Sequence, residues 1–308
     1  MRTSPPVRRR CVSCTGSDSL ADQQWVCGER RLDVFERVHI MGILNVTPDS
    51  FSDGGEHFSQ SLAIERALRM ADEGADIIDI GGESTRPGAE QVPVEEEIKR
   101  VIPIVASLSK DMRAAISIDT TKAAVAAAAL EAGAVIVNDV SAMRFDSNMT
   151  KVVKESGAGV VLMHMLGTPR TMQRDPHYED VVAEVSESLH RWADEAGENG
   201  IARESIAIDP GIGFGKTVQH NLRLLKDLAV LSAPKSTDSR ESFRYPLVVG
   251  PSRKSFIGAT LDVEVGDRVE GTAATVAWSV ARGAQVVRVH DVKQMARVVR
   301  MTEAIREA

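Results

Sequence analysis

Six polar residues suited to binding an anionic molecule each follow a short apolar run of the sequence: Asp119, Asn138, Asp209, Lys254, Arg288 and His290. Carboxylates accept hydrogen bonds and an amide both donates and accepts them, which suits a polar ring. Lys, Arg and His side chains suit a phosphate or a carboxylate. Helix caps and turns account for single Asp and Asn residues, but not for three basic residues among them. We therefore expect one binding site for a polar anion.

The elements that must position these residues are alternating strands and helices. Predicted strands cover residues 39–45, 75–80, 114–119, 134–139, 159–164, 205–209, 246–250 and 284–290. Predicted helices between them include residues 61–74, 94–110, 121–133 and 179–200, where apolar residues recur three and four positions apart. Eight such units favour a (β/α)8 TIM barrel over an open doubly wound sheet. The carboxyl ends of barrel strands meet at one face, where catalysis takes place.

Composition sets the limits of this expectation. The 308 residues carry a net charge of −7 and are 43% hydrophobic, so we expect a full core and no general attraction to nucleic acid or to an anionic membrane. No run reaches the roughly 18 apolar residues of a membrane helix, and we expect a cytoplasmic protein. We expect residues 25–308 to form a single barrel domain and residues 1–24 a polar, flexible tail, although the arginine-rich start is also compatible with a transit peptide.

The three cysteines and one glycine-rich motif do not indicate a further activity. Cys11, Cys14 and Cys27 precede the first predicted barrel strand, and free thiols explain them better than a zinc site that lacks its other ligands. The motif GIGFGKT, residues 211–217, has one residue too few for a P-loop. We expect its Lys216 and Thr217 to open the next helix. A polar insertion at 233–244 falls before a predicted strand, at the amino-terminal face of the barrel.

Two long loops follow the first two predicted strands. GILNVTPDSFSDGG, residues 42–55, and GGESTRPGAEQVP, residues 81–93, combine Gly and Pro with charged and hydroxyl groups. This profile is typical of loops that close over a substrate, although two ordinary mobile loops would share it.

A set of motifs at the predicted strand ends resembles the dihydropteroate synthase family. These are NVTPDSFSDGG, DIGGESTRPG, SIDT, NDVSA, MHMLGTPRTMQ, DPGIGFGKTVQHN, PSRKSFIG and VRVHDV. The resemblance extends from about Cys27 to the C-terminus. It implies a TIM barrel that condenses a dihydropterin bearing a CH2-O-diphosphate with p-aminobenzoate, in the presence of Mg²⁺, and releases diphosphate and 7,8-dihydropteroate for folate biosynthesis.

The resemblance also implies roles for individual residues. Pterin contacts fall to Asp119, Asn138, Met163, Asp209, Gly213 and Phe214. Diphosphate contacts fall to Arg86, Arg288 and His290, and the Mg²⁺ ligand to Asn45. The p-aminobenzoate pocket falls to Phe51, Thr85, Pro87, Lys254 and Ser255, with Lys254 reaching both substrates. Lys254, Arg288, His290 and Arg86 are the residues expected to act in catalysis.

Further implications of the family are inhibition by sulfonamides, which resemble p-aminobenzoate, and a homodimer formed through helices of the C-terminal half. Two other functions remain open. A pterin-binding methyltransferase shares the barrel and the pterin-binding Asp and Asn pattern, but it has no need of Arg288, His290 or the two loops. A non-catalytic pterin-binding protein would be expected to have lost a phosphate or loop residue, and all of them are present.

Overall fold

The computed structural model describes residues 23–47, 55–84, 88, 91–231, 233 and 243–308. Four predicted site residues, Phe51, Thr85, Arg86 and Pro87, lie outside the described residues, as do Cys11 and Cys14.

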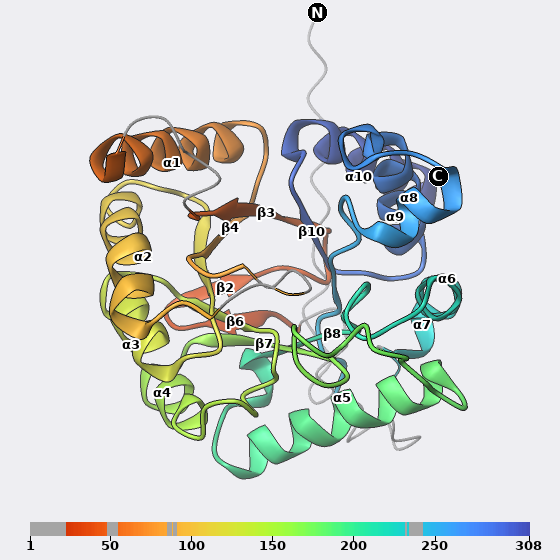
Figure 1. The fold of residues 1–308 in the computed structure, drawn as a ribbon, viewed down its shortest axis with the longest axis horizontal. Helices are drawn as coiled ribbons and strands as arrows, with labels where there is room; N and C mark the ends of the chain where they lie inside the picture. The colour runs from red at the N-terminus through yellow and green to blue at the C-terminus, as the bar shows by residue number, and fades with distance from the viewer. Residues whose placement is uncertain (1–22, 48–54, 85–87, 89–90, 232, 234–242) are drawn as a thin grey trace, which may run out of the picture.

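Eight parallel strands form a closed barrel at the centre of the molecule (Figure 1). They are β3 His39–Asn45, β4 Ile77–Gly81, β5 Ala115–Asp119, β6 Ile136–Asp139, β7 Gly159–Met163, β8 Ile206–Asp209, β9 Val248–Val249 and β10 Val286–Val289. Their order around the sheet is β8-β7-β6-β5-β4-β3-β10-β9. A parallel bridge between Ile208 of β8 and Leu247 beside β9 completes the ring. The predicted (β/α)8 barrel is confirmed, and each predicted strand overlaps an observed one.

Helices surround the barrel and cover the outward-facing side chains of its strands (Figure 1). They are α1 Gly55–Asp72, α2 Val94–Leu108, α3 Ala123–Glu131, α4 Met149–Ser156, α5 Val181–Glu198, α6 Val218–Lys226, α7 Leu228–Leu231, α8 Ser255–Leu261, α9 Val269–Ala281 and α10 Val292–Glu307. Short 3-10 turns lie at Arg203–Ser205 and Val265–Asp267. Because both faces of each strand are covered, the strands are apolar almost throughout. No helix in the described part of the chain is long and apolar enough to cross a membrane.

A hairpin that the sequence did not predict closes the amino-terminal end of the barrel. Its strands are β1 Trp25–Cys27 and β2 Arg30–Leu32, paired antiparallel. Trp25 and Cys27 are fully buried in an apolar cluster to which each of the eight barrel strands contributes one residue: Met41, Ile77, Ala115, Ile136, Val161, Ala207, Val248 and Val286. Trp25 also donates its indole N–H to the carbonyl of Ser205 at 3.0 Å. The hairpin therefore fills the end of the barrel opposite the predicted site.

The position of Cys27 corrects its grouping with the tail cysteines. Its thiol is free and buried, and burial raises its pKa. A Cβ atom added to Gly159, the first residue of β7, would lie 2.5 Å from the sulfur, so the cysteine packs directly against the barrel wall. Cys27 is a packing residue of the barrel.

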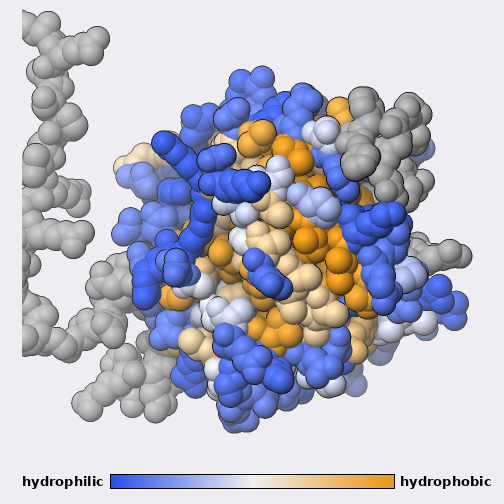
Figure 2. All heavy atoms as spheres, turned by 90° about the vertical axis from the view of Figure 1, so that its left-hand side faces the viewer, coloured by the Kyte–Doolittle hydropathy of each residue, from blue (hydrophilic) through white to orange (hydrophobic). Residues whose placement is uncertain are grey.

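The outer surface formed by α1 to α4 shows an apolar area surrounded by hydrophilic residues (Figure 2). On these helices Leu68 is 47% exposed, and the sequence of α3 is largely alanine.

The predicted polar insertion ends at the described residues Phe243 and Arg244, and the Arg244 guanidinium lies 5.8 Å from the ring of Phe35, just after the hairpin. This contact places the end of the insertion at the amino-terminal face of the barrel, as predicted.

Candidate active site

The register of the strands brings three predicted residues to one level of the barrel. Asn45 of β3 pairs with Gly81, Gly81 with Asp119 of β5, and Asp119 with Asn138 of β6. All of them lie at the carboxyl ends of their strands, where polar side chains lie above the apolar layers. The amide and carboxylate groups predicted to bind one ligand therefore lie together at the carboxyl-terminal end of the barrel, which is called the mouth below.

Arg288 links two carboxylates across this mouth. It donates from Nε to Oδ2 of Asp79 and from a terminal nitrogen to Oδ2 of Asp119, both at 2.6 Å. Asn138 donates its amide N–H to the same oxygen of Asp79 at 2.9 Å. Asp79 therefore fixes the positions of two predicted site residues, Arg288 and Asn138. The sequence indicated Asp79 only as one of the polar residues near a strand end.

Burial dominates the electrostatics of this cluster. It raises the pKa of Asp119 to about 7, although Arg288 opposes the shift. Burial disfavours the charge of Arg288, but the carboxylates of Asp79 and Asp119 outweigh it and raise the pKa of the guanidinium. In the described part of the chain, Oδ1 of Asp79 and Oδ1 of Asp119 are buried and have no hydrogen-bond partner. Buried acceptors of this kind are suited to N–H donors of a bound molecule.

The neighbouring strands β7 and β8 add a third carboxylate and an apolar wall. Asp209 pairs with Met163 across these strands and accepts a hydrogen bond from the amide of Gly211 at 2.7 Å. Burial raises its pKa, while Lys254 opposes the shift. A small apolar cluster beside this carboxylate contains Val140, Met163, Met165, Met172 and Phe214. Met163 and Phe214 thus have the surroundings predicted for the walls of a ring-binding pocket.

Lys254 reaches into the mouth from the segment after β9. Its ammonium donates to the carbonyl of Ile212 and lies 4.3 Å from the centre of the Phe214 ring. Gly213 lies against it, since an added Cβ would be 2.7 Å from Cδ of the lysine, and it has a φ of +85°. Burial lowers the pKa of Lys254 to about 7, and Asp209 opposes that shift. The next residue, Ser255, is exposed and begins α8.

His290 lies in a hydrogen-bonding group different from that of Arg288. Its Nδ1 is 3.0 Å from Oγ of Ser252, and its backbone N–H also donates to that oxygen at 3.2 Å. Arg66 of α1 donates to the carbonyl of His290. Ser252 is buried and therefore fixes the orientation of the imidazole, a role that the sequence did not indicate.

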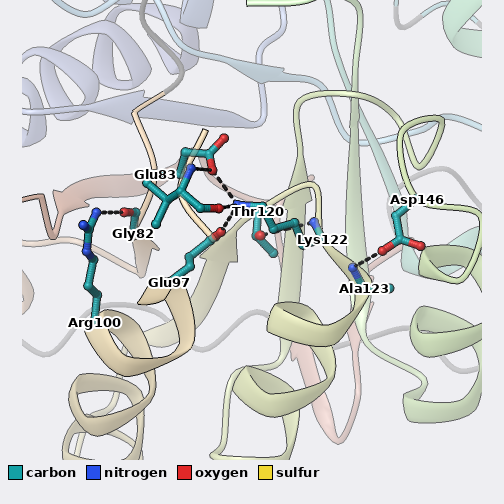
Figure 3. Close-up of polar contacts among 9 residues, drawn as sticks. Gly82, Glu83, Glu97, Arg100, Thr120, Lys122, Ala123 and Asp146 are labelled. Carbon is teal, nitrogen blue, oxygen red and sulfur yellow. Dashed lines mark hydrogen bonds and ion pairs between the residues drawn. The ribbon is translucent and has the colours of Figure 1, made fainter. Parts of the chain in front are cut away.

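A cluster of charges holds the start and the end of the second predicted loop. Lys122, just before α3, donates to both Glu83 and Glu97 and to the carbonyl of Val92 (Figure 3). Glu83 also accepts a hydrogen bond from the amide of Val92 at 2.8 Å. Glu83 and Val92, which are nine positions apart in the sequence, are thereby joined. Glu83, Glu97, Lys122 and Asp119 line a small cleft, so the base of the loop adjoins the strand-end carboxylate of Asp119.

The described residues contain no group of three or more His, Cys, Asp or Glu side chains arranged to hold a metal ion. Asn45 is a single amide oxygen donor at the end of β3. One protein oxygen with water and substrate phosphates suits Mg²⁺, which keeps much of its hydration shell. The predicted Mg²⁺ ligand therefore fits an ion that arrives with a phosphorylated substrate.

Comparison with known proteins agrees with this arrangement. Residues 41–290 match the family model described as pterin binding enzyme. The dihydropteroate synthase of Synechocystis sp. is 46% identical over 279 residues, which cover 90% of this chain and 93% of the relative.

Solved structures show the same similarity in three dimensions. A Yersinia pestis dihydropteroate synthase with a sulfonamide drug complex has a TM-score of 0.84 and 40% identity, and the match covers 92% of this chain and 100% of that one. A Burkholderia cenocepacia dihydropteroate synthase complexed with 7,8-dihydropteroate has a TM-score of 0.82 and 42% identity, over 92% and 97% of the two chains.

Proposed function

The chain belongs to the pterin-binding enzyme family as a dihydropteroate synthase, and from this premise we propose how its residues divide the reaction. The substrates are (7,8-dihydropterin-6-yl)methyl diphosphate and p-aminobenzoate, and the products are 7,8-dihydropteroate and diphosphate. The observation that carries the assignment of roles is the bridge of Arg288 between Asp79 and Asp119 beside Asn138. It supports this proposal because buried carboxylates able to accept from a pterin, and a guanidinium able to meet a diphosphate, lie at the same end of the barrel.

The pterin ring binds between β5, β6 and β8 in this proposal. Its aminopyrimidinone edge presents adjacent N–H donors, which the carboxylate of Asp209 accepts in bidentate fashion. Oδ1 of Asp119 is buried without a partner among the described residues and is directed to a further ring N–H, while the amide of Asn138 contacts the ring from the same level. Met163 and Phe214 pack against the faces of the ring.

Departure of diphosphate is the step that requires the positive groups. The C–O bond breaks, its electron pair stays with the diphosphate, and a resonance-stabilised pterin methylene cation remains, as in the family mechanism. Arg288 has N–H donors beyond the two that bind Asp79 and Asp119, and these stabilise the charge that develops on the leaving group. His290, held by Ser252, and Arg86, which lies outside the described residues, complete this group.

The aniline nitrogen of p-aminobenzoate then attacks the methylene carbon, forms the C–N bond and loses a proton. The nitrogen needs alignment more than activation by a base, because it is nucleophilic without deprotonation. Lys254 reaches from the pterin wall toward the second substrate, and Ser255 binds its carboxylate. Phe51, Thr85 and Pro87 line the remainder of that pocket in the proposal and lie outside the described residues.

Asn45 is the proposed protein ligand of Mg²⁺. When bound, the ion neutralises negative charge on the diphosphate and so favours its departure.

Three further features stand as proposals. A homodimer through the C-terminal helices is supported by exposed apolar residues on α8, α9 and the turn between them: Leu261, Val265 and Trp278 are 50%, 57% and 44% exposed. Light scattering tests the dimer, with Trp278→Glu as the variant expected to be monomeric.

Sulfonamides are proposed to compete with p-aminobenzoate. The cytoplasmic location is tested by cell fractionation.

The experiment that tests the function is an assay of purified protein with dihydropterin methyl diphosphate and Mg²⁺, with and without p-aminobenzoate. Formation of dihydropteroate that depends on p-aminobenzoate, and that sulfonamide inhibits competitively, is the expected result. Pterin binding without condensation would overturn it and favour a methyltransferase or a non-catalytic pterin-binding protein.

A further inference from the structure

Lys216 is a buried lysine, 3% exposed, that the proposed reaction does not use. It precedes α6, and the sequence predicted only that it opens that helix. Thr217 does cap α6, accepting a hydrogen bond from the amide of His220. The side chain of Lys216 instead turns inward, beneath the proposed pterin pocket. We propose that Lys216 is a positioning residue. It holds residues 209–215, the segment from the end of β8 that carries Asp209 and Phe214, in the conformation that binds the pterin.

The three N–H donors of the ammonium match three acceptors from two different loops. Lys216 Nζ lies 2.8 Å from the carbonyl of Phe214, 3.2 Å from the carbonyl of His164 and 3.1 Å from His164 Nδ1. His164 follows β7, whereas Phe214 belongs to the loop after β8. One side chain therefore ties together the loops that carry Met163 and Phe214, the two proposed walls of the ring pocket.

The two loops are in close contact at this point. The backbone amide of His164 donates to the carbonyl of Asp209 at 2.9 Å. Gly211 has a φ of +63°, and an added Cβ would lie only 1.9 Å from the carbonyl oxygen of His164. The buried carbonyl groups of His164 and Phe214 would be costly without hydrogen-bond donors, and both accept from one buried ammonium group. Lys216 supplies that cation.

Lys254 also contacts this loop but cannot replace Lys216. It donates to the carbonyl of Ile212 and lies over the Phe214 ring. In the proposed reaction Lys254 turns toward the substrates and gives up part of this contact. The partners of Lys216 all belong to the protein, so its contacts remain when substrate binds. Phe214 then stays in place through Lys216.

Below about pH 7 the charge at this position resides on Lys216 and not on His164. Burial and the positive charges of Lys216 and Arg144 lower the pKa of His164 to about 2, so the imidazole is neutral and accepts through Nδ1. Burial lowers the pKa of Lys216 itself to about 7, while Asp209 opposes this shift and Lys254 adds to it. Asp209 in turn faces the positive groups Lys254, Arg288 and Lys216 and the amide of Gly211. Lys216 therefore favours the ionised form of the proposed pterin-binding carboxylate.

Two substitutions separate the geometric and electrostatic parts of this role. Lys216→Gln keeps N–H donors without the charge, whereas Lys216→Met removes both. Lys226→Met, on the exposed face of α6, is the matched control. The affinity for 6-hydroxymethyl-7,8-dihydropterin, which lacks a titrating diphosphate, is measured by calorimetry from pH 5 to pH 9, beside the KM of p-aminobenzoate and the melting temperature.

We expect Lys216→Met to weaken pterin binding on the order of 10- to 100-fold, while the KM of p-aminobenzoate changes less than about threefold. Lys216→Gln should lose less affinity. In both variants the fall in affinity toward low pH should begin at higher pH than in the wild type, because Asp209 is protonated more readily without the cation. A purely structural lysine would lower the melting temperature without moving that pH profile.

Equal loss for both substrates, or an unchanged pH profile in the glutamine variant, overturns the inference. Lys216→Gln keeps the test available if the methionine variant does not fold. The inference rests on the placement of pterin beside Asp209, which Asp209→Asn tests separately. If Asp209→Asn abolishes pterin binding and the Lys216 variants do not weaken it, only the role of Lys216 fails. If neither affects it, the placement of the pterin is wrong.

Discussion

Arg288 at the end of β10 donates its Nε–H to Oδ2 of Asp79 on β4 at 2.6 Å, although 209 residues separate them in sequence. The side chain of Asp79 is fully buried and that of Arg288 is 17% exposed. The same guanidinium also binds Asp119. A cation proposed to meet the leaving diphosphate is thus held before substrate arrives, as electrostatic preorganisation requires.

Substitution of Asp79 by Asn should weaken the interaction that holds Arg288 while leaving a side chain of the same size and shape in place. The amide oxygen still accepts from Arg288, but one of the two charges that balance the guanidinium is lost. We expect the free energy of unfolding to fall by about 1–3 kcal/mol and kcat/KM to fall on the order of tenfold or more. Urea denaturation and steady-state kinetics measure both.

Glu65→Gln is the control for the stability of this variant. Glu65 forms an exposed pair with Arg69, whose side chain is 55% exposed, and such pairs contribute about 0–1 kcal/mol. Equal losses in the two variants would show that Asp79 has no special role.

The affinity for the pterin ring should depend on pH through Asp119 as well as through Asp209. Burial raises the pKa of the Asp119 carboxyl to about 7, so that it takes up a proton as pH falls through 7. The protonated group accepts a ring N–H poorly, and affinity for 6-hydroxymethyl-7,8-dihydropterin should fall toward about tenfold per pH unit below that point. Calorimetry across the range tests this. Asp119→Asn should bind weakly with a flatter profile, and an unaltered profile in that variant would assign the titration to another group.

The same pKa has a consequence for stability, with a sign opposite to that of a salt-bridged carboxylate. Between about pH 4 and pH 7 the folded protein holds a proton on Asp119 that the unfolded chain has released. The contribution of Asp119 to stability is therefore largest at low pH and declines as pH rises through this window.

The barrel and most of its mouth could be predicted because both follow from local pattern. Apolar runs mark the strands, the first of which was predicted and found at His39–Asn45, and the polar residue that ends each run lies at the mouth by the geometry of a parallel barrel. Asn45, Asp119 and Asn138 were predicted separately, and the strand register brings them to one level.

Contacts between distant parts of the chain were not predictable in this way. The strands of the Trp25–Leu32 hairpin are three residues each, too short for a periodic signal, and their stability comes from contacts such as Trp25 with Ser205. Lys216 has the expected place before α6, but its direction depends on how two loops stack. Nothing in the sequence around Asp79, in the middle of β4, indicates its partner Arg288, which is 209 positions away.

Removal of Mg²⁺ should reveal the role of Asn45. With a chelator present, we expect the turnover of diphosphate substrate to fall sharply, while the binding of 6-hydroxymethyl-7,8-dihydropterin, which has no phosphate, stays unchanged. Asn45→Ala should require a higher Mg²⁺ concentration for half-maximal activity, because the ion loses its proposed protein ligand. A titration of activity against Mg²⁺ measures the shift. Identical titrations for the variant and the wild type would exclude Asn45 as the ligand.

The Trp25–Leu32 hairpin, which closes the amino-terminal end of the barrel, should affect stability and not catalysis. Trp25 is fully buried and bonded to Ser205, so Trp25→Ala should lower the free energy of unfolding by about 3–5 kcal/mol. Kinetics measured well below the melting temperature should stay within about twofold of wild type, since the site lies at the other end of the strands. Leu68→Ala on exposed α1 provides the comparison, with a loss of at most about 0.5 kcal/mol. A large change in either KM of Trp25→Ala would show that the amino-terminal end of the barrel is coupled to the site at its carboxyl-terminal end.

The ion cluster at the base of the second loop should influence p-aminobenzoate more than pterin. Lys122 joins Glu83 to Glu97, and the side chain of Glu97 is only 1% exposed. Lys122→Met leaves that carboxylate buried without its cation, which should lower the free energy of unfolding by about 3–5 kcal/mol and loosen the tie between Glu83 and Val92.

Because two of the residues proposed to bind p-aminobenzoate, Thr85 and Pro87, lie between Glu83 and Val92 in the sequence, the KM of p-aminobenzoate should rise in Lys122→Met while pterin affinity is kept. Adding Glu97→Gln removes the unpaired charge and should recover much of the stability but not the KM, since the tie to Glu83 and Val92 is still absent. Lys151→Met, at a side chain that is 72% exposed, is the matched control for loss of a lysine. A double variant that regains both stability and KM would mean that Lys122 acts on the loop only through the folding of the chain.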